Sequence, residues 1–171
     1  MTKGEKNVYL LNMVLMAENL TKSYPQARGE LKVLKGINLI VEDKDFIAIV
    51  GESGVGKTTL LQILGLLDKP TSGRLLLDSV DPLALPEQEL AEYRNQRIGF
   101  VFQFHHLMPE FTVEENIALP MLMSKRTKGE AISEARYLLE RFSLEDKSES
   151  YPHQLSGGER QRADVLRAIA N

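Results

Sequence analysis

Residues 46–64, FIAIVGESGVGKTTLLQIL, decide the fold that we expect for this chain. The apolar run FIAIV predicts a buried β-strand, and KTTLLQILGLLD, which ends before Pro70 and Gly73, predicts a helix. Between them GESGVGKT, Gly51–Thr58, matches the pattern GxxxxGK[ST] in the strand-then-helix context that this pattern requires. Such a loop wraps backbone N–H groups around phosphate oxygens, and the helix N-terminus adds about half a positive charge. The stretch therefore predicts a nucleoside triphosphate site.

The residues expected to bind the nucleotide form one continuous run: Gly51, Glu52, Ser53, Gly54, Val55, Gly56, Lys57, Thr58 and Thr59. We expect Lys57 to neutralise the β- and γ-phosphates and the Thr58 hydroxyl to bind Mg²⁺. A glycine-rich turn that only joins a strand to a helix would not need Lys followed by Thr at these positions. Lys57 and Thr58 therefore favour binding over a purely structural turn.

On either side of this stretch, the spacing of apolar residues indicates which elements to expect, and it changes from strand-like to helical along the chain. Apolar and β-branched runs predict further strands at 14–20, 31–42, 74–78 and 98–102. A helix opened by Pro86 follows the third of these runs. After residue 102 only helical patterns are found, at 115–123 and 128–142, and then in the last residues of the chain. This order predicts an α/β sheet domain that carries a helical arm.

The two helices of the arm have different local signals. Thr112 and Glu115 form a capping box, and Pro120 is expected to break or kink the helix that follows. The helix at 128–142 has apolar residues at helical spacing, which predict core packing.

Composition limits the classes of protein. The chain has 171 residues, a net charge of -3 and no cysteine, which favours one domain in a reducing compartment, the cytoplasm by default. Lys and Arg are scattered, so nucleic acid is not expected as a partner. Apolar runs are shorter than the ~20 residues of a membrane span.

Residues 1–12 are expected to be a tail or an overlong start, with Met13 or Met16 as the alternative start. A secretory signal is disfavoured, because Asn12 interrupts the apolar run that such a signal needs.

A second glycine motif, SGGE, lies at Ser156–Glu159. Ser156 and Glu159 fit a capping box, which leaves Gly157 and Gly158 unexplained, although each costs about 1 kcal/mol relative to Ala inside a helix. Glycines at a capped N-terminus would leave N–H groups bare for an anion such as a second phosphate. From the residues alone, both interpretations stay open.

With the P-loop, LSGGERQR and its place after the helical arm, the chain resembles the ATP-binding cassette (ABC) ATPases from about Leu15 onward. The resemblance implies a P-loop NTPase sheet core with an N-terminal antiparallel β part. It also implies a helical subdomain at about 104–156, all within a domain at 13–171 that is incomplete at its C-terminus. Two cassettes of this family pair head to tail, so Ser156, Gly157, Gly158 and Glu159 are expected to contact the ATP held by the partner of a homodimer.

Two further site residues are implied by the same resemblance. Gln103, after the predicted strand 98–102, matches the Q-loop glutamine, which contacts Mg²⁺ and the attacking water; it is the one expected catalytic residue in the chain. Tyr24 lies where the family stacks an aromatic ring on adenine. Taken alone, Gln103 is more simply structural, and Tyr24 is as compatible with the core as with a ligand.

Residues 94–122, RNQRIGFVFQFHHLMPEFTVEENIALPML, resemble the ATPases of lipoprotein-releasing transporters, with cell-division and macrolide-efflux cassettes as near relatives. This implies a subunit peripheral on the inner membrane whose residues Phe104–Phe111 contact transmembrane permease subunits. His105 and His106 are expected to pack or hydrogen-bond rather than to bind a metal, because no nearby ligand has a suitable spacing. The apolar residues 118–123 fit either the arm core or the partner surface.

The family also needs a hydrophobic strand ending in Asp, an adjacent Glu as general base and a switch His after the signature helix. None is found in the 171 residues, so we expect ATP binding without hydrolysis and an open interior edge of the central sheet. Asp164 lies where relatives have a small apolar residue, and Leu166 is larger than usual. Three hypotheses follow: the N-terminal part of a transporter ATPase, a hydrolysis-inert binding or docking module, and an SMC- or repair-type ATPase, which the short gap between Lys57 and Ser156 disfavours.

Overall fold

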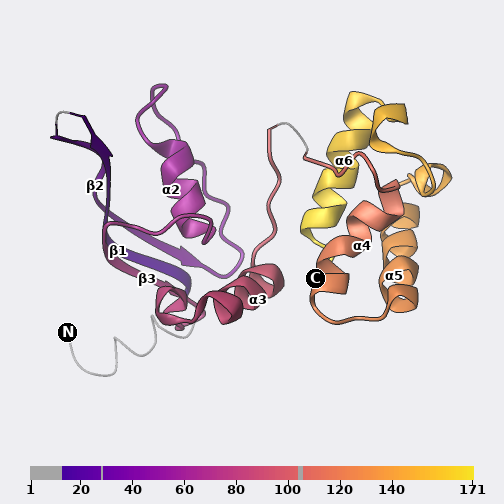
Figure 1. Ribbon diagram of the computed structural model, residues 1–171, viewed down its shortest axis with the longest axis horizontal. Coiled ribbons are helices and arrows are strands. Elements are labelled where there is room, and N and C mark those ends of the chain that lie inside the picture. Colours follow the sequence, from indigo (N-terminus) through magenta and orange to yellow (C-terminus); the bar gives the residue numbers. More distant parts are fainter. Residues whose placement is uncertain (1–12, 28, 104–105) are drawn as a thin grey trace. The chain divides into compact units, whose positions relative to one another are not determined.

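The computed structural model describes residues 13–27, 29–103 and 106–171, and the chain divides into two compact units, Met1–Leu90 and Ala91–Asn171 (Figure 1). The expected tail at 1–12 lies outside the described residues, as do Phe104 and His105. The expected helical subdomain, about 104–156, falls within the second unit, and its bounds stay a prediction. Helices and an antiparallel sheet together give the α/β class that the sequence predicts.

The first unit is built on a three-stranded antiparallel sheet in the order β2-β1-β3. The strands are β1 (Met13–Gln26), β2 (Gly29–Glu42) and β3 (Ser72–Leu77). Ala17 pairs with Leu39 of β2 on one side and with Leu75 of β3 on the other. The strands predicted at 14–20, 31–42 and 74–78 are therefore confirmed, with β1 six residues longer at its C-terminal end than expected.

Helix α2 (Lys57–Leu64) follows the glycine-rich loop and packs against the sheet. It ends four residues before the expected Asp68, because Gly65 forms its C-cap. The described part of the first unit buries these apolar residues: Ala17, Leu20, Leu34, Leu60, Ile63, Leu66, Leu75, Leu76, Leu77 and Leu90. A short 3₁₀ turn η1 (Pro82–Ala84) and helix α3 (Glu87–Arg97) come after β3.

The strands predicted at 46–50 and 98–102 are wrong. Both segments are unpaired, and within the described ranges the only sheet is the one formed by β1, β2 and β3. Phe46 is 97% exposed and Val50 is 86% exposed, so this apolar run lies outside the core. An apolar run becomes a strand only when a neighbouring strand accepts its backbone hydrogen bonds, and this condition is not local.

The second unit is a small helical bundle. Its helices are α4 (Val113–Met123), α5 (Lys128–Arg141) and α6 (Gly157–Ala168), with 3₁₀ turns η2 (Glu145–Lys147) and η3 (Pro152–Gln154) between α5 and α6. All three helices begin with a capping box, at Thr112, Thr127 and Ser156. Helix α4 continues through Pro120 to Met123, so Pro120 does not break it, and the alternative of a kink stays a prediction.

The core of the bundle confirms the prediction that the apolar residues of the helix at 128–142 pack inward, since Ala135 and Leu139 are among its members. It consists of Val113, Ile117, Ala118, Met121, Ala131, Ala135, Leu139, Leu144, Leu155, Ala163, Leu166 and Ala170. Ala118 and Met121 are buried, whereas Met123 is 68% exposed, so the segment 118–123 contributes both to the core and to the surface. No helix in the described parts of the chain is long and apolar enough to cross a membrane.

Candidate phosphate-binding site

The predicted phosphate-binding loop has the backbone that its glycines allow. Gly54 has φ +78° and Gly56 has φ +105°, in the left-handed region that other residues rarely adopt. A Cβ on Gly56 would also lie 2.8 Å from Cγ1 of Val33 on β2. Glycine at 56 is therefore needed both for the turn and for the close approach of the loop to the sheet.

Lys57, the first residue of α2, lies back across the loop. Its ammonium group donates to the carbonyl oxygens of Gly51 at 2.8 Å and Glu52 at 2.6 Å. Both acceptors are on exposed backbone, so these hydrogen bonds lie where solvent and ligands have access. The loop thus concentrates positive charge next to a helix N-terminus.

The N-terminus of α2 has unused donors. Its N-cap, Gly56, has no side chain, so the first N–H groups of the helix are available to a ligand or to water. Thr58 is exposed in the first turn, and Thr59 is half-buried. An exposed hydroxyl beside these donors fits the Mg²⁺ ligand that the sequence predicts, because Mg²⁺ takes few protein oxygens and keeps waters and phosphates as its other ligands.

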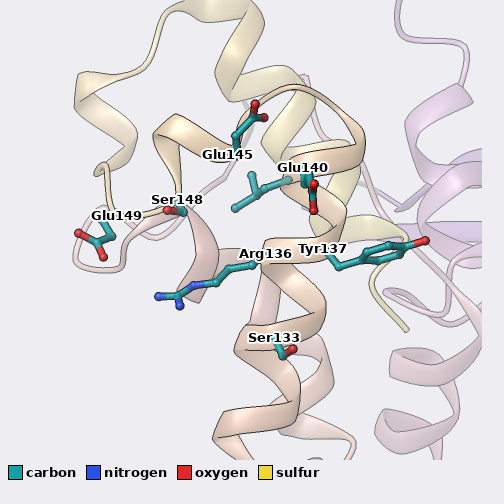
Figure 2. A pocket seen from close by; sticks show the side chains of 8 residues that line it. Ser133, Arg136, Tyr137, Glu140, Glu145, Ser148 and Glu149 are labelled. Atoms are coloured by element: carbon teal, nitrogen blue, oxygen red, sulfur yellow. The ribbon is translucent and has the colours of Figure 1, made fainter.

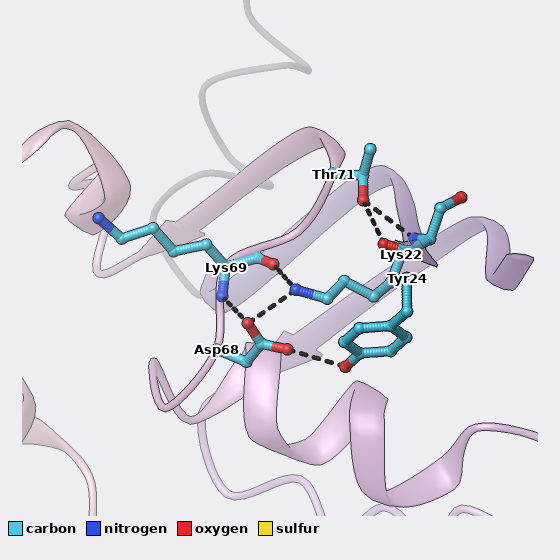
Figure 3. A network of polar contacts seen from close by, with 6 residues as sticks. Lys22, Tyr24, Asp68, Lys69 and Thr71 are labelled. Carbon is cyan, nitrogen blue, oxygen red and sulfur yellow. Dashed lines mark hydrogen bonds and ion pairs between the residues drawn. The ribbon is translucent and has the colours of Figure 1, made fainter. Parts of the chain in front are cut away.

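Tyr24, the residue expected beside adenine, belongs to a polar network in the first unit (Figure 3). Its hydroxyl donates to Oδ2 of Asp68 at 2.9 Å, and Nζ of Lys22 lies 4.9 Å from the centre of its ring. Lys22 also donates to Oδ1 of Asp68 at 2.7 Å. These contacts fix the orientation of a half-buried ring; the stacking on adenine stays a prediction.

Asp68 is the acidic centre of this network. Burial raises the pKa of its carboxyl, but hydrogen bonds from Lys22, Tyr24 and the Lys69 N–H outweigh that effect and leave the pKa below its ordinary value. The carboxylate therefore links β1 to the segment after α2 in its ionised form.

The second glycine motif forms the capping box that the sequence predicts. The Glu159 N–H donates to the Ser156 hydroxyl at 3.3 Å, and the Ser156 N–H donates to the Glu159 carboxylate at 2.7 Å. Hydrogen bonds from Ser156 lower the pKa of Glu159, with a smaller contribution from the charges of Lys147 and Arg162. The carboxylate is therefore held charged at the start of α6.

Gly157 and Gly158 have no structural requirement for glycine. Neither has a positive φ, and a Cβ on either would meet no atom within 4 Å. Both residues are exposed at the N-terminus of α6. The fold therefore explains Ser156 and Glu159 but not the two glycines between them.

Gln103 is exposed in the second unit, at the end of a segment that packs against α6. The Phe102 N–H before it donates to Oδ2 of Asp164 at 3.3 Å. Gln103 and the loop at 51–56 belong to different units. The side chain of His106 packs edge-on against the ring of Phe102, with centroids 4.9 Å apart. In the described residues no group of His, Cys, Asp and Glu could hold a metal ion.

Two buried polar residues of the second unit, Asn116 and Asp164, are not among the site residues predicted from the sequence. Asn116, fully buried on α4, accepts from the Met108 N–H at 2.7 Å and donates to the carbonyls of Met108, Phe111 and Thr112. Asp164 is fully buried on α6 and pairs with Arg167 at 2.5 Å. In the sequence, the only sign of these two residues is that each is a polar residue on the apolar face of a helix. Their hydrogen-bond partners cannot be predicted from the sequence, because they depend on the tertiary structure.

A hollow of about 660 Å³ lies on the second unit beside α5 and η2 (Figure 2). Its lining is Ser133, Arg136, Tyr137, Leu139, Glu140, Glu145, Ser148 and Glu149. Arg136 is engaged by Glu114 on α4, at 2.7 Å. None of the lining residues belongs to the predicted nucleotide, signature or glutamine sites.

Comparison with protein families matches residues 34–171 to the ABC transporter family. The lipoprotein-releasing system ATP-binding protein LolD of Porphyromonas gingivalis is 46% identical over 159 residues, which cover 93% of this chain and 71% of that protein. LolD of Aquifex aeolicus is 48% identical over 158 residues, which cover 92% of this chain and 69% of that protein.

Solved structures give the same result for the fold. A dimeric structure of a bacterial ABC transporter cassette has a TM-score of 0.83 and 38% identity, and covers 92% of this chain and 69% of that one. A dimeric post-hydrolysis state of an ATP-binding cassette, bound to ADP and phosphate, has the same TM-score, identity and coverage.

Proposed function

Because the chain belongs to the ABC transporter family of ATP-binding proteins, we propose that it supplies residues that bind ATP and Mg²⁺ to a transporter subunit that powers the release of lipoproteins from the inner membrane. The family and its nucleotide-binding role rest on the matched domain and on the cassette structures. The lipoprotein cargo is the finer part of the proposal, supported by 46–48% identity to LolD proteins from distant bacteria.

The geometry of the P-loop is the observation that supports ATP binding most directly. Lys57 makes two hydrogen bonds to loop carbonyls at an uncapped helix N-terminus. In the bound state these exposed bonds exchange for phosphate oxygens, to which a charged donor binds more strongly. The remaining loop residues contribute backbone N–H groups, and Tyr24 provides the ring for adenine.

Mg²⁺ would be held by the Thr58 hydroxyl and by Gln103, with phosphate oxygens as its other ligands. When bound, the ion neutralises charge that develops on the phosphates. The chain contributes two exposed groups: the Thr58 hydroxyl in the first turn of α2 and the Gln103 amide after Phe102. Gln103 would also orient the attacking water.

The signature motif would act on the nucleotide of a second copy. Two similar cassette structures are dimeric, one of them bound to ADP and phosphate. The open backbone at Gly157 and Gly158 permits close approach of a phosphate to the N-terminus of α6. Ser156 and Glu159 would hold this N-terminus in shape, and the homodimer would contain two such composite sites.

Contact with transmembrane permease subunits is proposed for the loop before α4, the region 104–111. Met108 is 48% exposed and Phe111 is 39% exposed, while Asn116 holds their backbone in place. A fixed loop with exposed apolar side chains is suited to receive part of another protein. The subunit would then be cytoplasmic and peripheral on the inner membrane.

A binding experiment separates the proposed cargo class from the alternatives, a related efflux or cell-division transporter. We expect the chain to bind detergent-solubilised permease subunits of a lipoprotein-releasing system more tightly than those of macrolide-efflux or cell-division systems. Phe111→Ala should weaken this binding at least tenfold, the loss of one apolar anchor. Phe142→Ala, a control of similar exposure at 41%, should not. Equal or tighter binding to another class would contradict the cargo assignment.

Turnover is a separate question from binding. No acidic residue after Glu159 follows a hydrophobic strand, so the sequence contains no candidate for the general base of these ATPases. We propose that these 171 residues bind Mg-ATP weakly and do not hydrolyse it, as a nucleotide-binding or docking module would behave. A phosphate-release assay tests this, and release well above the background of a Lys57→Ala sample would overturn it.

A further inference from the structure

The segment before and after Gln103 is fastened to one face of α6 at three points. Gly99 lies so close to the Ala168 carbonyl oxygen that a Cβ on Gly99 would overlap it. The Phe102 N–H donates to Asp164 at 3.3 Å, and the His106 carbonyl accepts from Nη1 of Arg167 at 2.7 Å.

The three residues on α6 belong together. Asp164, Arg167 and Ala168 are spaced i, i+3 and i+4, so they lie on the same side of the helix, one turn apart. The side chain of Asp164 is fully buried and that of Arg167 is 15% exposed. Arg167 bonds both to the Asp164 carboxylate and to the His106 carbonyl, so the two side chains form one unit.

A buried carboxylate is costly unless charged and hydrogen-bonded partners surround it. Here the partners are the Arg167 guanidinium and a backbone N–H of the segment that carries Gln103. The buried Asp164 carboxylate therefore needs the Phe102 N–H in place, and the backbone at Phe102 is in turn held by Asp164. A small apolar side chain at 164 would provide no such acceptor.

We propose that Asp164, together with Arg167, is a positioning pair that couples the glutamine segment to the signature helix. Asp164 fixes the backbone immediately before Gln103, and Arg167 fixes it at His106, beyond residues 104–105, which lie outside the described residues. Movement of α6 is thereby transmitted to the backbone next to Gln103. The effect on Gln103 rests on the proposed function, whereas the contacts between the segment and α6 are present in the chain without nucleotide.

Hydrogen–deuterium exchange on the 171-residue chain without nucleotide tests the fastening. Asp164→Ala should speed exchange of the amides at 100–103 at least about tenfold, the loss of one hydrogen bond to a charged group. Amides of α4 and α5 should keep their protection. Asp164→Asn retains an acceptor oxygen for the Phe102 N–H and should keep most of the protection, so it shows that the acceptor matters and not only the volume.

Leu166→Ala is the matched control, since this fully buried side chain lies on the same helix but contacts the bundle core. It should raise exchange throughout the second unit. If Asp164→Ala gives the same general loss of protection, the residue has only a structural role and the proposal is wrong. Unchanged exchange at 100–103 would overturn it equally.

The coupling to Gln103 is tested by a double-mutant cycle on the dependence of ATP affinity on Mg²⁺. Gln103→Ala and Asp164→Ala should reduce the gain in affinity from Mg²⁺ to a similar extent, and the double variant should lose no more than either single one. Additive losses would overturn the coupling. If the wild-type chain does not bind ATP at all, the proposed function fails, whereas the exchange result still decides the fastening.

Discussion

Gly157 and Gly158 are the residues whose chemistry is least explained by the fold. Each has ordinary backbone angles and open space where a side chain would lie. Glycine at such positions costs stability relative to alanine. Gly129 is the matching glycine on α5. It is the second residue of a helix with a Thr127–Glu130 capping box, and a Cβ added to it would meet no atom within 4 Å.

These glycines allow a matched comparison of stability and function. Gly158→Ala and Gly129→Ala should both raise the stability of the second unit, each by up to about 1 kcal/mol. Only Gly158→Ala should weaken ATP-dependent dimerisation, because its methyl group would block the approach of the phosphate held by the partner. Chemical unfolding followed by circular dichroism and sedimentation in Mg-ATP measure the two effects. Equal dimerisation of both variants would contradict the proposed role of the signature motif.

Gly99 should give the opposite result to Gly129. A methyl group at this position would overlap the Ala168 carbonyl oxygen, so the segment or α6 must shift. Gly99→Ala is expected to destabilise the second unit by about 1–3 kcal/mol, the usual cost of overpacking. Chemical unfolding measures the loss. A Gly99→Ala variant as stable as wild type would show that the segment is not packed on α6.

Asp68 should make the first unit sensitive to acid. Its pKa is lowered in the folded state, so its stabilising contribution is present above the unfolded value of about 4 and is lost as the pH falls through the folded value. At pH 7, Asp68→Asn should cost about 1–2 kcal/mol. The difference from wild type should shrink below about pH 4.

The control for Asp68 is the exposed pair of Asp43 and Lys44, 3.6 Å apart with both side chains more than two-thirds exposed. Asp43→Asn should have almost no effect at any pH, because exposed pairs contribute little. A difference between wild type and Asp68→Asn that grows on acidification would contradict the assigned direction of the pKa shift.

At the scale of elements, the loop before α4 depends on one buried side chain. Asn116 supplies an acceptor and two amide hydrogens to the backbone at 108–112. Asn116→Ala would leave these buried groups unpaired, at a cost of about 2–3 kcal/mol in the second unit. Asn95→Ala, which removes one bond from a half-buried side chain to the Pro120 carbonyl, should cost about 1 kcal/mol.

The loop itself provides the functional readout of this change. Asn116→Ala should weaken permease binding together with stability, because Phe111 loses its fixed backbone. Asn95→Ala should leave permease binding unchanged. Retained permease binding in Asn116→Ala would contradict the proposed docking loop.

The elements show which parts of the fold were local enough to predict. Helices α4, α5 and α6 begin where Thr112, Thr127 and Ser156 have a Glu three residues later, and this signal lies within four residues of sequence. The hairpin strands were predictable from their period and turn. The apolar runs at 46–50 and 98–102 have equally good strand sequences, but a strand requires a partner that composition cannot supply.

The site divides in the same way. The positive φ angles of Gly54 and Gly56 follow from the loop pattern, so the conformation of this loop could be predicted from the sequence. The Tyr24–Asp68 bond and the Asp164–Phe102 bond join residues 44 and 62 positions apart, which no local pattern indicates. Asp164 departs from the family pattern in the sequence itself, whereas its partners Phe102 and Arg167 follow only from the structure.

At the scale of the whole molecule, the residues proposed for nucleotide binding are divided between the two units. The P-loop and Tyr24 belong to the first unit, and Gln103 with the signature motif belongs to the second. In the proposed dimer each nucleotide would be bound by the P-loop of one copy and contacted by the signature motif of the other. Both units must therefore be present for closure, whereas the first contact with phosphate depends on Lys57.

Calorimetric titration of the 171-residue chain with Mg-ATP, beside its Lys57→Ala and Lys69→Ala variants, tests the central claim most directly. Lys69 is an exposed lysine of the same unit outside the P-loop, so it controls for the loss of a positive charge. The wild-type chain and Lys69→Ala should bind with similar, weak affinity. Lys57→Ala should bind at least about a hundredfold more weakly, the loss of charged hydrogen bonds to phosphate. A Lys57→Ala variant that binds Mg-ATP as tightly as the wild-type chain, or with nanomolar affinity, would contradict the assignment of the P-loop.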